Sequence, residues 1–177
     1  MPSPIARQRE VPPFHLLRRI VLGASTSETF TRGNVLASFG WLILVFRTLF
    51  GKHSTQRTSS VACVVAGVLS GAYLILLCEY IAKSSSDSSS SSSLLASFST
   101  LEGVSRLFRD EGVLCAAWLH YLAFDLLIGE RLSAIERAEG IPRVFTVGTT
   151  LPLTFIAGPV GYLWSRACVW LARRFRR

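Results

Sequence analysis

Four long apolar stretches constrain this chain more than any other feature, because each has a length that suits a helix crossing a lipid bilayer. They cover approximately residues 30–50, 61–82, 113–129 and 144–164. A helix needs about 20 predominantly apolar residues to cross a hydrocarbon core about 30 Å thick. Half of the 177 residues are apolar. The sequence therefore predicts an all-α integral membrane bundle of four transmembrane helices with short interfacial helices.

The predicted membrane domain covers residues 25–166 and lies between a basic N-terminal segment, residues 1–24, and a basic C-terminal tail, residues 167–177. Two interpretations of residues 1–24 remain open, a helix on the membrane surface and a targeting segment. Residues 84–93 are nine serines and one aspartate, a composition typical of a flexible loop between spans.

Side chains that cap helices mark the expected helix starts. Ser25 with Glu28, and Ser99 with Glu102, have capping-box spacing, and Asp110 is placed to cap the third span. We expect the third helix to continue past the apolar stretch until glycine and proline at positions 140 and 142 stop it.

The net charge of +8 is carried by basic residues that lie mostly between and beyond the apolar stretches. This distribution favours membrane lipids over nucleic acid as the partner. With four spans, thirteen lysines and arginines lie on the side of the two termini and six lie on the other side. Because cytoplasmic loops carry the excess of positive charge, we predict both termini on the cytosolic or stromal side.

The cysteines are expected to act as small apolar side chains. Cys63, Cys78, Cys115 and Cys168 occur singly, and none has a second cysteine or a histidine at metal-ligand spacing. The sequence therefore predicts no metal site, and it gives no reason to expect a cofactor.

His120 and Asp125 are the two ionisable residues deepest in an apolar stretch, where such residues often mark function. Five residues apart on a helix they are rotated by about 140° from one another, so they do not easily pair. Asp125 shares a face with Trp118 and Tyr121, and we expect Tyr121 to donate its hydroxyl hydrogen to the carboxylate. Two interpretations stay open: a functional site, or polar contacts that hold the helices together.

The fourth stretch is interrupted by Pro152 and by the sequence Gly-Pro-Val-Gly at 158–161. Proline removes backbone donors, and glycine permits the close approach of another helix or a flat ligand. We therefore expect a kinked fourth helix that can line a ligand groove.

The block Trp-Leu-His-Tyr-Leu-Ala-Phe-Asp-Leu-Leu-Ile-Gly at 118–129, followed by Leu-Pro-Leu-Thr-Phe at 151–155 and Gly-Pro-Val-Gly at 158–161, resembles the abscisic-acid-deficient-4 family. The likeness extends from about Phe30 to Arg166. The chain departs from the plant pattern at Ala117, where glycine is common, at Glu130, and in the Ser-rich insert.

Plant members of this family are required to convert the di-epoxide violaxanthin into the allenic neoxanthin in plastid membranes. The resemblance implies an intramolecular isomerase of a carotenoid epoxide. Opening an epoxide to an allene needs a proton donor and a base, and the candidates are Asp125 as the acid and His120 as the base, with Tyr121 beside Asp125. In a photosynthetic host it implies a plastid membrane. The positions that it marks as ligand-binding are Asn34, Trp118, Gly129, Pro152, Gly158, Pro159 and Gly161.

A second hypothesis is a non-catalytic membrane protein that binds a pigment or lipid, or that assists the assembly of a partner membrane protein. Under it, the polar residues of the third span are contacts between helices. A proton-coupled carrier is a third, less favoured reading, because the chain shows no internal repeat.

Overall fold

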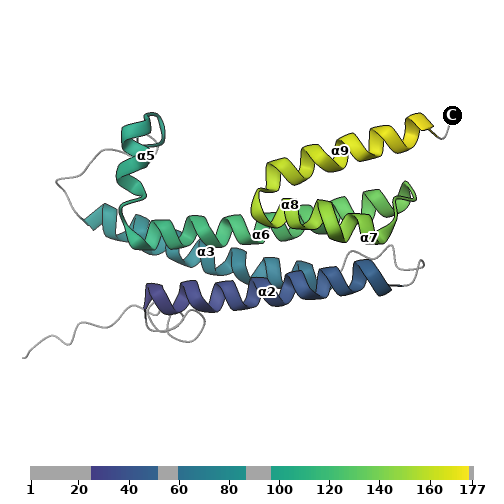
Figure 1. The fold of residues 1–177 in the computed structure, drawn as a ribbon. Helices are drawn as coiled ribbons and strands as arrows, with labels where there is room; N and C mark the ends of the chain where they lie inside the picture. Colours follow the sequence, from purple (N-terminus) through teal and green to yellow (C-terminus); the bar gives the residue numbers. More distant parts are fainter. Residues whose placement is uncertain (1–24, 52–59, 87–96, 176–177) are drawn as a thin grey trace, which may run out of the picture.

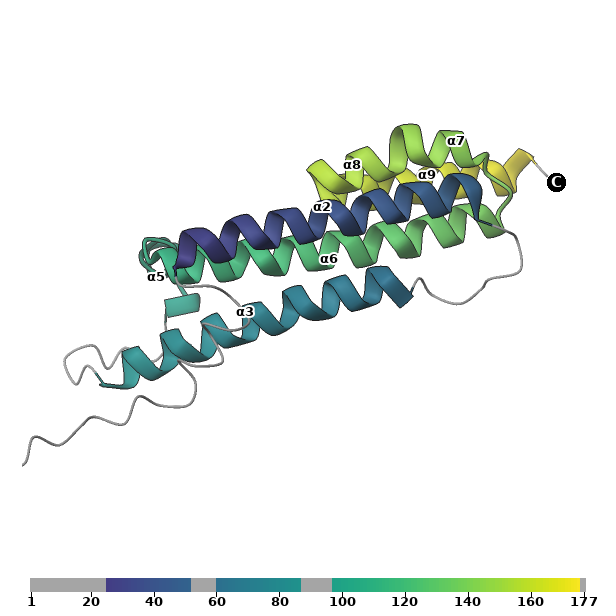
Figure 2. The ribbon, with the colours of Figure 1, turned by 90° about the horizontal axis from the view of Figure 1, so that it is seen from below.

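The structure is a computed structural model that describes residues 25–51, 60–86 and 97–175, and these residues form helices and no strand. Three long helices pack together, and the shorter helices of the C-terminal third lie against one side of them (Figures 1 and 2). The elements are α2 (Thr26–Phe50), α3 (Ser60–Ser86), α5 (Leu101–Leu107), α6 (Glu111–Ala138), α7 (Arg143–Phe145), the π-helix η1 (Thr146–Thr150), α8 (Leu151–Ile156) and α9 (Gly158–Phe175).

The predicted helix starts are confirmed at two of three positions. Ser25 caps α2 and Asp110 caps α6, each accepting a hydrogen bond from the backbone N–H three residues later, at 3.1 and 3.0 Å. The predicted cap of α5 at Ser99 is wrong by one residue. Thr100, in extended backbone conformation, is the N-cap and accepts from Gly103 N at 3.1 Å. Serine and threonine both cap helices well, so the spacing to Glu102 could not show which of Ser99 and Thr100 is the N-cap.

Three of the predicted spans form helices that are long and apolar enough to cross a membrane: α2, α3 and α6, with 25, 27 and 28 residues. At 1.5 Å per residue each is roughly 37–42 Å long, which exceeds the hydrocarbon thickness. As predicted, α6 continues beyond residue 129 and ends just before Gly140, whose φ of 67° is favourable only for glycine.

A fourth transmembrane helix is not confirmed. The predicted span 144–164 is broken at Ala157 (φ −154°, ψ 84°), where the chain reverses direction and α9 runs back along α8 (Figure 1). Before the break, residues 143–156 form a continuous helical segment about 21 Å long, too short to cross the bilayer.

Backbone chemistry explains the break. Pro159 has no N–H to donate to the carbonyl of Phe155, and its ring excludes a continuous helix there. Val160 N and Gly161 N instead donate to Ala157 O, at 2.9 and 3.1 Å, which begins α9 as a new helix. The expected kink is therefore a complete reversal.

The reversal changes which ends of the chain lie together. Arg173 Nε, near the end of α9, donates to Glu139 Oε1 at 2.9 Å. The end of α9 therefore lies beside the C-terminal end of α6, at the other end of the bundle from the start of α2 (Figure 1). The prediction that both termini share one side rested on a fourth crossing, which is not confirmed, so it stays a prediction. With three crossings, eight lysines and arginines lie on the side of the N-terminus and eleven lie on the other side. The thirteen-to-six bias is then absent and no longer sets the orientation.

Some predicted segments lie outside the described residues. These are residues 1–24 and most of the Ser-rich loop, although residues 84–86 form the last turn of α3. The predicted basic tail, residues 167–177, is helical as far as Phe175, because α9 continues through it.

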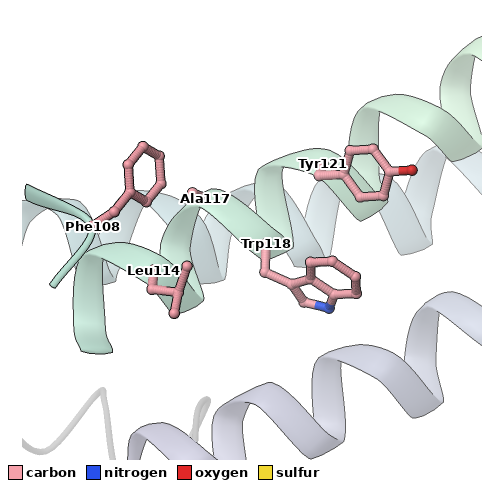
Figure 3. Close-up of a pocket in the computed structure, with 5 residues that line it drawn as sticks. All are labelled: Phe108, Leu114, Ala117, Trp118 and Tyr121. Atoms are coloured by element: carbon pink, nitrogen blue, oxygen red, sulfur yellow. The ribbon is translucent and has the colours of Figure 1, made fainter. Parts of the chain in front are cut away.

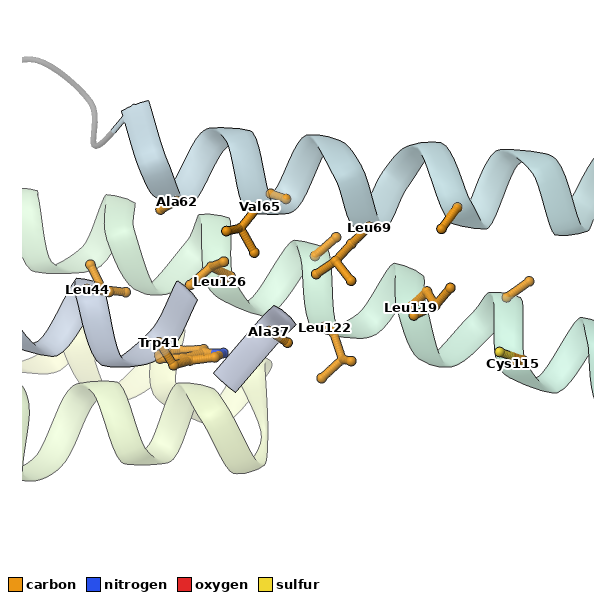
Figure 4. Packing of buried hydrophobic residues seen from close by; sticks show 14 of the residues in the cluster. Ala37, Trp41, Leu44, Ala62, Val65, Leu69, Cys115, Leu119, Leu122 and Leu126 are labelled. Carbon is orange, nitrogen blue, oxygen red and sulfur yellow. The ribbon is translucent and has the colours of Figure 1, made fainter. Parts of the chain in front are cut away.

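Side chains of α2, α3 and α6 make the core, and two glycines of α2 lie against leucines of α6 (Figure 4). A Cβ on Gly33 would lie 2.3 Å from Leu119 Cδ2, and one on Gly40 would lie 2.7 Å from Leu126 Cδ2. The two glycines are seven residues apart, as are the two fully buried leucines, so each leucine fills a gap over one glycine. Leu69 of α3 closes the same core from the other side.

The reversal predicts that reporters fused to the N-terminus and to the C-terminus of the full chain lie on opposite sides of the membrane. Three crossings place the ends on opposite sides, whereas four would place them together. Side-selective protease digestion of each fusion in sealed vesicles measures this. Protection of both reporters, or cleavage of both, would contradict the three-crossing arrangement.

Gly161→Ala should lower the free energy of unfolding by about 1–3 kcal/mol, because the new Cβ would lie 2.2 Å from Thr154 Oγ1 and 2.5 Å from Thr154 N. Gly71→Ala is the matched control, since its Cβ meets nothing within 4 Å and alanine favours a helix by up to about 1 kcal/mol. Thermal unfolding in detergent measures both variants. Equal melting temperatures would contradict the packing of α9 on α8.

Candidate functional site

Asp125 lies where the middle of α6 meets the first residue of α9. The side chain is 5% exposed, and a Cβ on Gly158 would lie 2.1 Å from its Oδ1. The other oxygen, Oδ2, is buried and has no hydrogen-bond partner among the described residues. Such an oxygen is costly to bury. It is therefore the group in this region best placed to meet a polar atom of a ligand.

Tyr121 holds the helix reversal against α6. Its hydroxyl donates to Ile156 O at 2.9 Å and approaches Phe155 O at 3.5 Å. These are the carbonyls that lose their helical donors at the reversal. The hydroxyl also lies within hydrogen-bonding reach of the Asp125 carboxylate, its expected partner. One turn of α6 therefore places Tyr121 and Asp125 at the start of α9.

An aromatic surface continues from Tyr121 along α6. The Trp118 ring packs between Tyr121 and Phe30, with centroid distances of 5.5 and 5.8 Å, and Trp118 Nε1 donates to Asn34 Oδ1 at 2.9 Å. This bond fixes the indole against α2.

An open groove of about 270 Å³ lies over this surface (Figure 3). Its lining is apolar except at the Tyr121 hydroxyl, beside which Asp125 lies. The groove thus offers apolar contact along α6 and polar groups at one end. It is lined by Phe108, Leu114, Ala117, Trp118 and Tyr121.

His120 lies on a different side of α6 from Asp125. It stacks on Phe124, with ring centroids 4.5 Å apart, and packs against Tyr73 of α3 at 5.2 Å. The separation that helical geometry predicts for His120 and Asp125 is therefore present. The structure does not bring the two residues together as an acid and a base.

The remaining positions that the resemblance marked as ligand-binding pack helices together or face outward. Gly129 makes room for Trp41, whose Cη2 would be 2.8 Å from a Cβ there. Gly161 packs on α8, and the exposed Pro152 and Pro159 shape the backbone. Of the seven, Asn34, Trp118 and Gly158 contribute to the groove or to the surroundings of Asp125.

Sequence reasoning missed a second buried carboxylate, Glu136. Its side chain is fully buried, and it accepts hydrogen bonds from Thr146 Oγ1 at 2.7 Å and from Thr150 Oγ1 at 2.8 Å. Both threonines lie on the π-helix that precedes Pro152, where the helix widens because proline cannot continue the hydrogen-bond ladder. Glu136 follows Asp125 by eleven residues, three helical turns, so their shared face was detectable in the sequence.

Within the described residues, no three histidine, cysteine or acidic side chains lie together as metal ligands. The candidate site consists of the Asp125 carboxyl group, the Tyr121 hydroxyl and an aromatic groove. These features and the three long apolar helices define a small helical membrane protein with a buried carboxyl group beside a tyrosine that lines an apolar groove.

A family model described as ABA DEFICIENT 4-like matches residues 28–164, and the chain belongs to that family. The match runs from the first turn of α2 into α9 and includes Asp125 and the groove. No curated protein and no solved structure matches the chain significantly.

The contact between Asp125 and Gly158 predicts an energetic coupling. Gly158→Ala alone should destabilise the protein, because the new Cβ would collide with the carboxylate. In an Asp125→Ala background the same change should cost less, with a coupling of about 0.5–3 kcal/mol. Thermal unfolding of the four proteins in detergent measures the coupling, and additive effects would contradict the contact.

Proposed function

We propose that this protein isomerises the epoxide end of an oxygenated polyene of the carotenoid type within the membrane, with Asp125 as the proton donor. One observation carries the proposal: Asp125 Oδ2 is buried and without a partner among the described residues, next to a groove with aromatic walls. The family membership supports the same substrate class through the activity that the resemblance implies.

The groove suits one end of a long, flat, apolar molecule. Its volume of about 270 Å³ holds only part of a C40 pigment, and its open side lets the remainder lie among lipid chains. Aromatic rings such as Trp118 provide flat apolar contact. An oxygen atom at the ligand's end would then reach Asp125 past Tyr121, where the hydroxyl hydrogen is already used by Ile156 O.

With His120 on another side of α6, we propose that Asp125 serves first as the acid and then as the base. The protonated carboxyl gives its proton to the epoxide oxygen while the C–O bond to the polyene-bearing ring carbon breaks. The resulting cation is stabilised by the polyene. The carboxylate then removes the proton from the next chain carbon, which yields the allene and restores the carboxyl. No atom is gained or lost, as an isomerisation requires.

Expression in cells that make violaxanthin, followed by separation of the pigments, tests the proposal. We expect neoxanthin with the wild-type chain and at least a hundredfold less with Asp125→Asn, because proton transfer by a positioned side chain contributes about 10²–10⁴-fold. Glu130→Gln is the matched control, since it changes another buried carboxyl of α6 that bonds Cys63 and does not line the groove.

Non-catalytic binding of a pigment or lipid is the second candidate function. It is favoured by the single carboxyl group at the groove, because acid–base isomerases usually employ two groups. Under this function the purified protein carries bound pigment, yet cells that express the wild-type chain form no neoxanthin. Under the isomerase function product forms and disappears with Asp125→Asn, while the variant keeps its melting temperature. Unchanged product with a folded Asp125→Asn variant would rule out the proposed role of Asp125.

A further inference from the structure

Three arginines gather at the C-terminal end of α2, far from the groove. Arg137 Nη2 lies 3.3 Å from Arg47 O and 3.4 Å from Thr48 O, and Arg143 Nη1 donates to Leu49 O at 3.0 Å. In Figure 2 this end of α2 lies beside α7 and the last turns of α6. The side chains of Arg47, Arg137 and Arg143, here called the arginine cluster, are each partly buried.

The arginine cluster has more positive charge than its surroundings compensate. Arg137 lies close enough to Arg47 and Arg143 for their charges to repel, and its Nε is buried without a hydrogen-bond partner among the described residues. The carbonyls at the end of α2 supply only about half a negative charge.

The two carboxylates closest to Arg137 in the sequence bond other residues. Glu136 accepts from the two threonines of η1, and Glu139 pairs with Arg173. A guanidinium group presents five N–H donors, and the bonds to α2 use few of them. The arginine cluster therefore has both the charge and the free donors to bind an anion.

We propose that the arginine cluster binds the phosphate of an anionic lipid headgroup. Guanidinium groups bind phosphate through paired hydrogen bonds, and partly buried side chains lose less freedom on binding. A lipid is favoured over a free phosphate because the cluster lies at the end of a helix long enough to cross the membrane. The last turns of α2 also expose Phe46 and Phe50, whose rings lie together with centroids 4.9 Å apart and offer apolar contact for acyl chains.

The site is separate from the proposed isomerase site. Arg137 follows Asp125 by twelve residues of α6, or about 18 Å along the helix axis. The lipid site therefore does not depend on the proposed function.

The full-length protein in neutral detergent tests the proposal, with phosphatidylglycerol, phosphatidylcholine or inorganic phosphate added in separate titrations. We expect phosphatidylglycerol to raise the melting temperature at a lower concentration than phosphatidylcholine does. Native mass spectrometry should show the corresponding bound lipid. Arg143→Gln and Arg47→Gln should each weaken phosphatidylglycerol binding by about fivefold.

Arg47→Gln keeps the test valid if Arg143→Gln unfolds, because Arg47 contributes its backbone carbonyl, not its guanidinium, to the bonds at the end of α2. Arg109→Gln is the matched control, since Arg109 is exposed between α5 and α6 at the other end of the bundle. Equal binding of phosphatidylglycerol by Arg47→Gln, Arg109→Gln and wild type would overturn the proposal. Equal stabilisation by inorganic phosphate would overturn the assignment to a lipid.

Discussion

The hydrogen bond from Tyr121 to the carbonyl of Ile156 is the interaction on which the arrangement of the C-terminal third depends. A helix that reverses among apolar helices leaves backbone carbonyls without donors, and in the absence of water each such group costs free energy. Pro159 has no N–H for the carbonyl of Phe155. Val160 N, which would serve the carbonyl of Ile156 in a continuous helix, donates to Ala157 O instead. Tyr121 supplies the missing donor from α6, so the reversal is held against the central helix.

The same bond bears on the proposed role of Asp125. A tyrosine hydroxyl has one hydrogen to donate, and Tyr121 gives it to the backbone. The carboxylate beside it therefore keeps an unpartnered oxygen, while the lack of a side chain on Gly158 lets the start of α9 close over it. The hydrogen bond that holds the helix reversal therefore also leaves Asp125 Oδ2 for the proposed proton transfer.

The sequence was sufficient wherever local pattern decides the structure. Helical length and hydropathy predicted α2, α3 and α6, capping chemistry located Ser25 and Asp110, and the helical period separated His120 from Asp125. These features depend on neighbours a few residues away, so a single sequence contains them.

The fourth stretch shows where local pattern is insufficient. Residues 144–164 have the length and composition of a span, and Pro159 is compatible with either a kink or a reversal. The choice depends on whether a side chain of another helix donates to the freed carbonyls. That donor, Tyr121, precedes Pro159 by 38 residues in the sequence. The orientation predicted from the count of positive charges depends on the same choice, because the count changes with the number of crossings. The sequence could not predict the groove for the same reason. The hydrogen bond from Trp118 to Asn34, which fixes one wall, forms only because α2 packs against α6.

The two buried carboxylates on one face of α6 show how a structural role is separated from a functional one. Both sit where a helix is irregular, Glu136 beside the π-helix and Asp125 beside the reversal. Glu136 has a threonine hydroxyl on each oxygen, so its hydrogen bonds offset much of its desolvation, and it gains nothing from a ligand. Asp125 lacks that compensation at Oδ2 and lies next to an open groove. Burial is shared by both residues, and the unsatisfied oxygen of Asp125 is the observation that supports its proposed role.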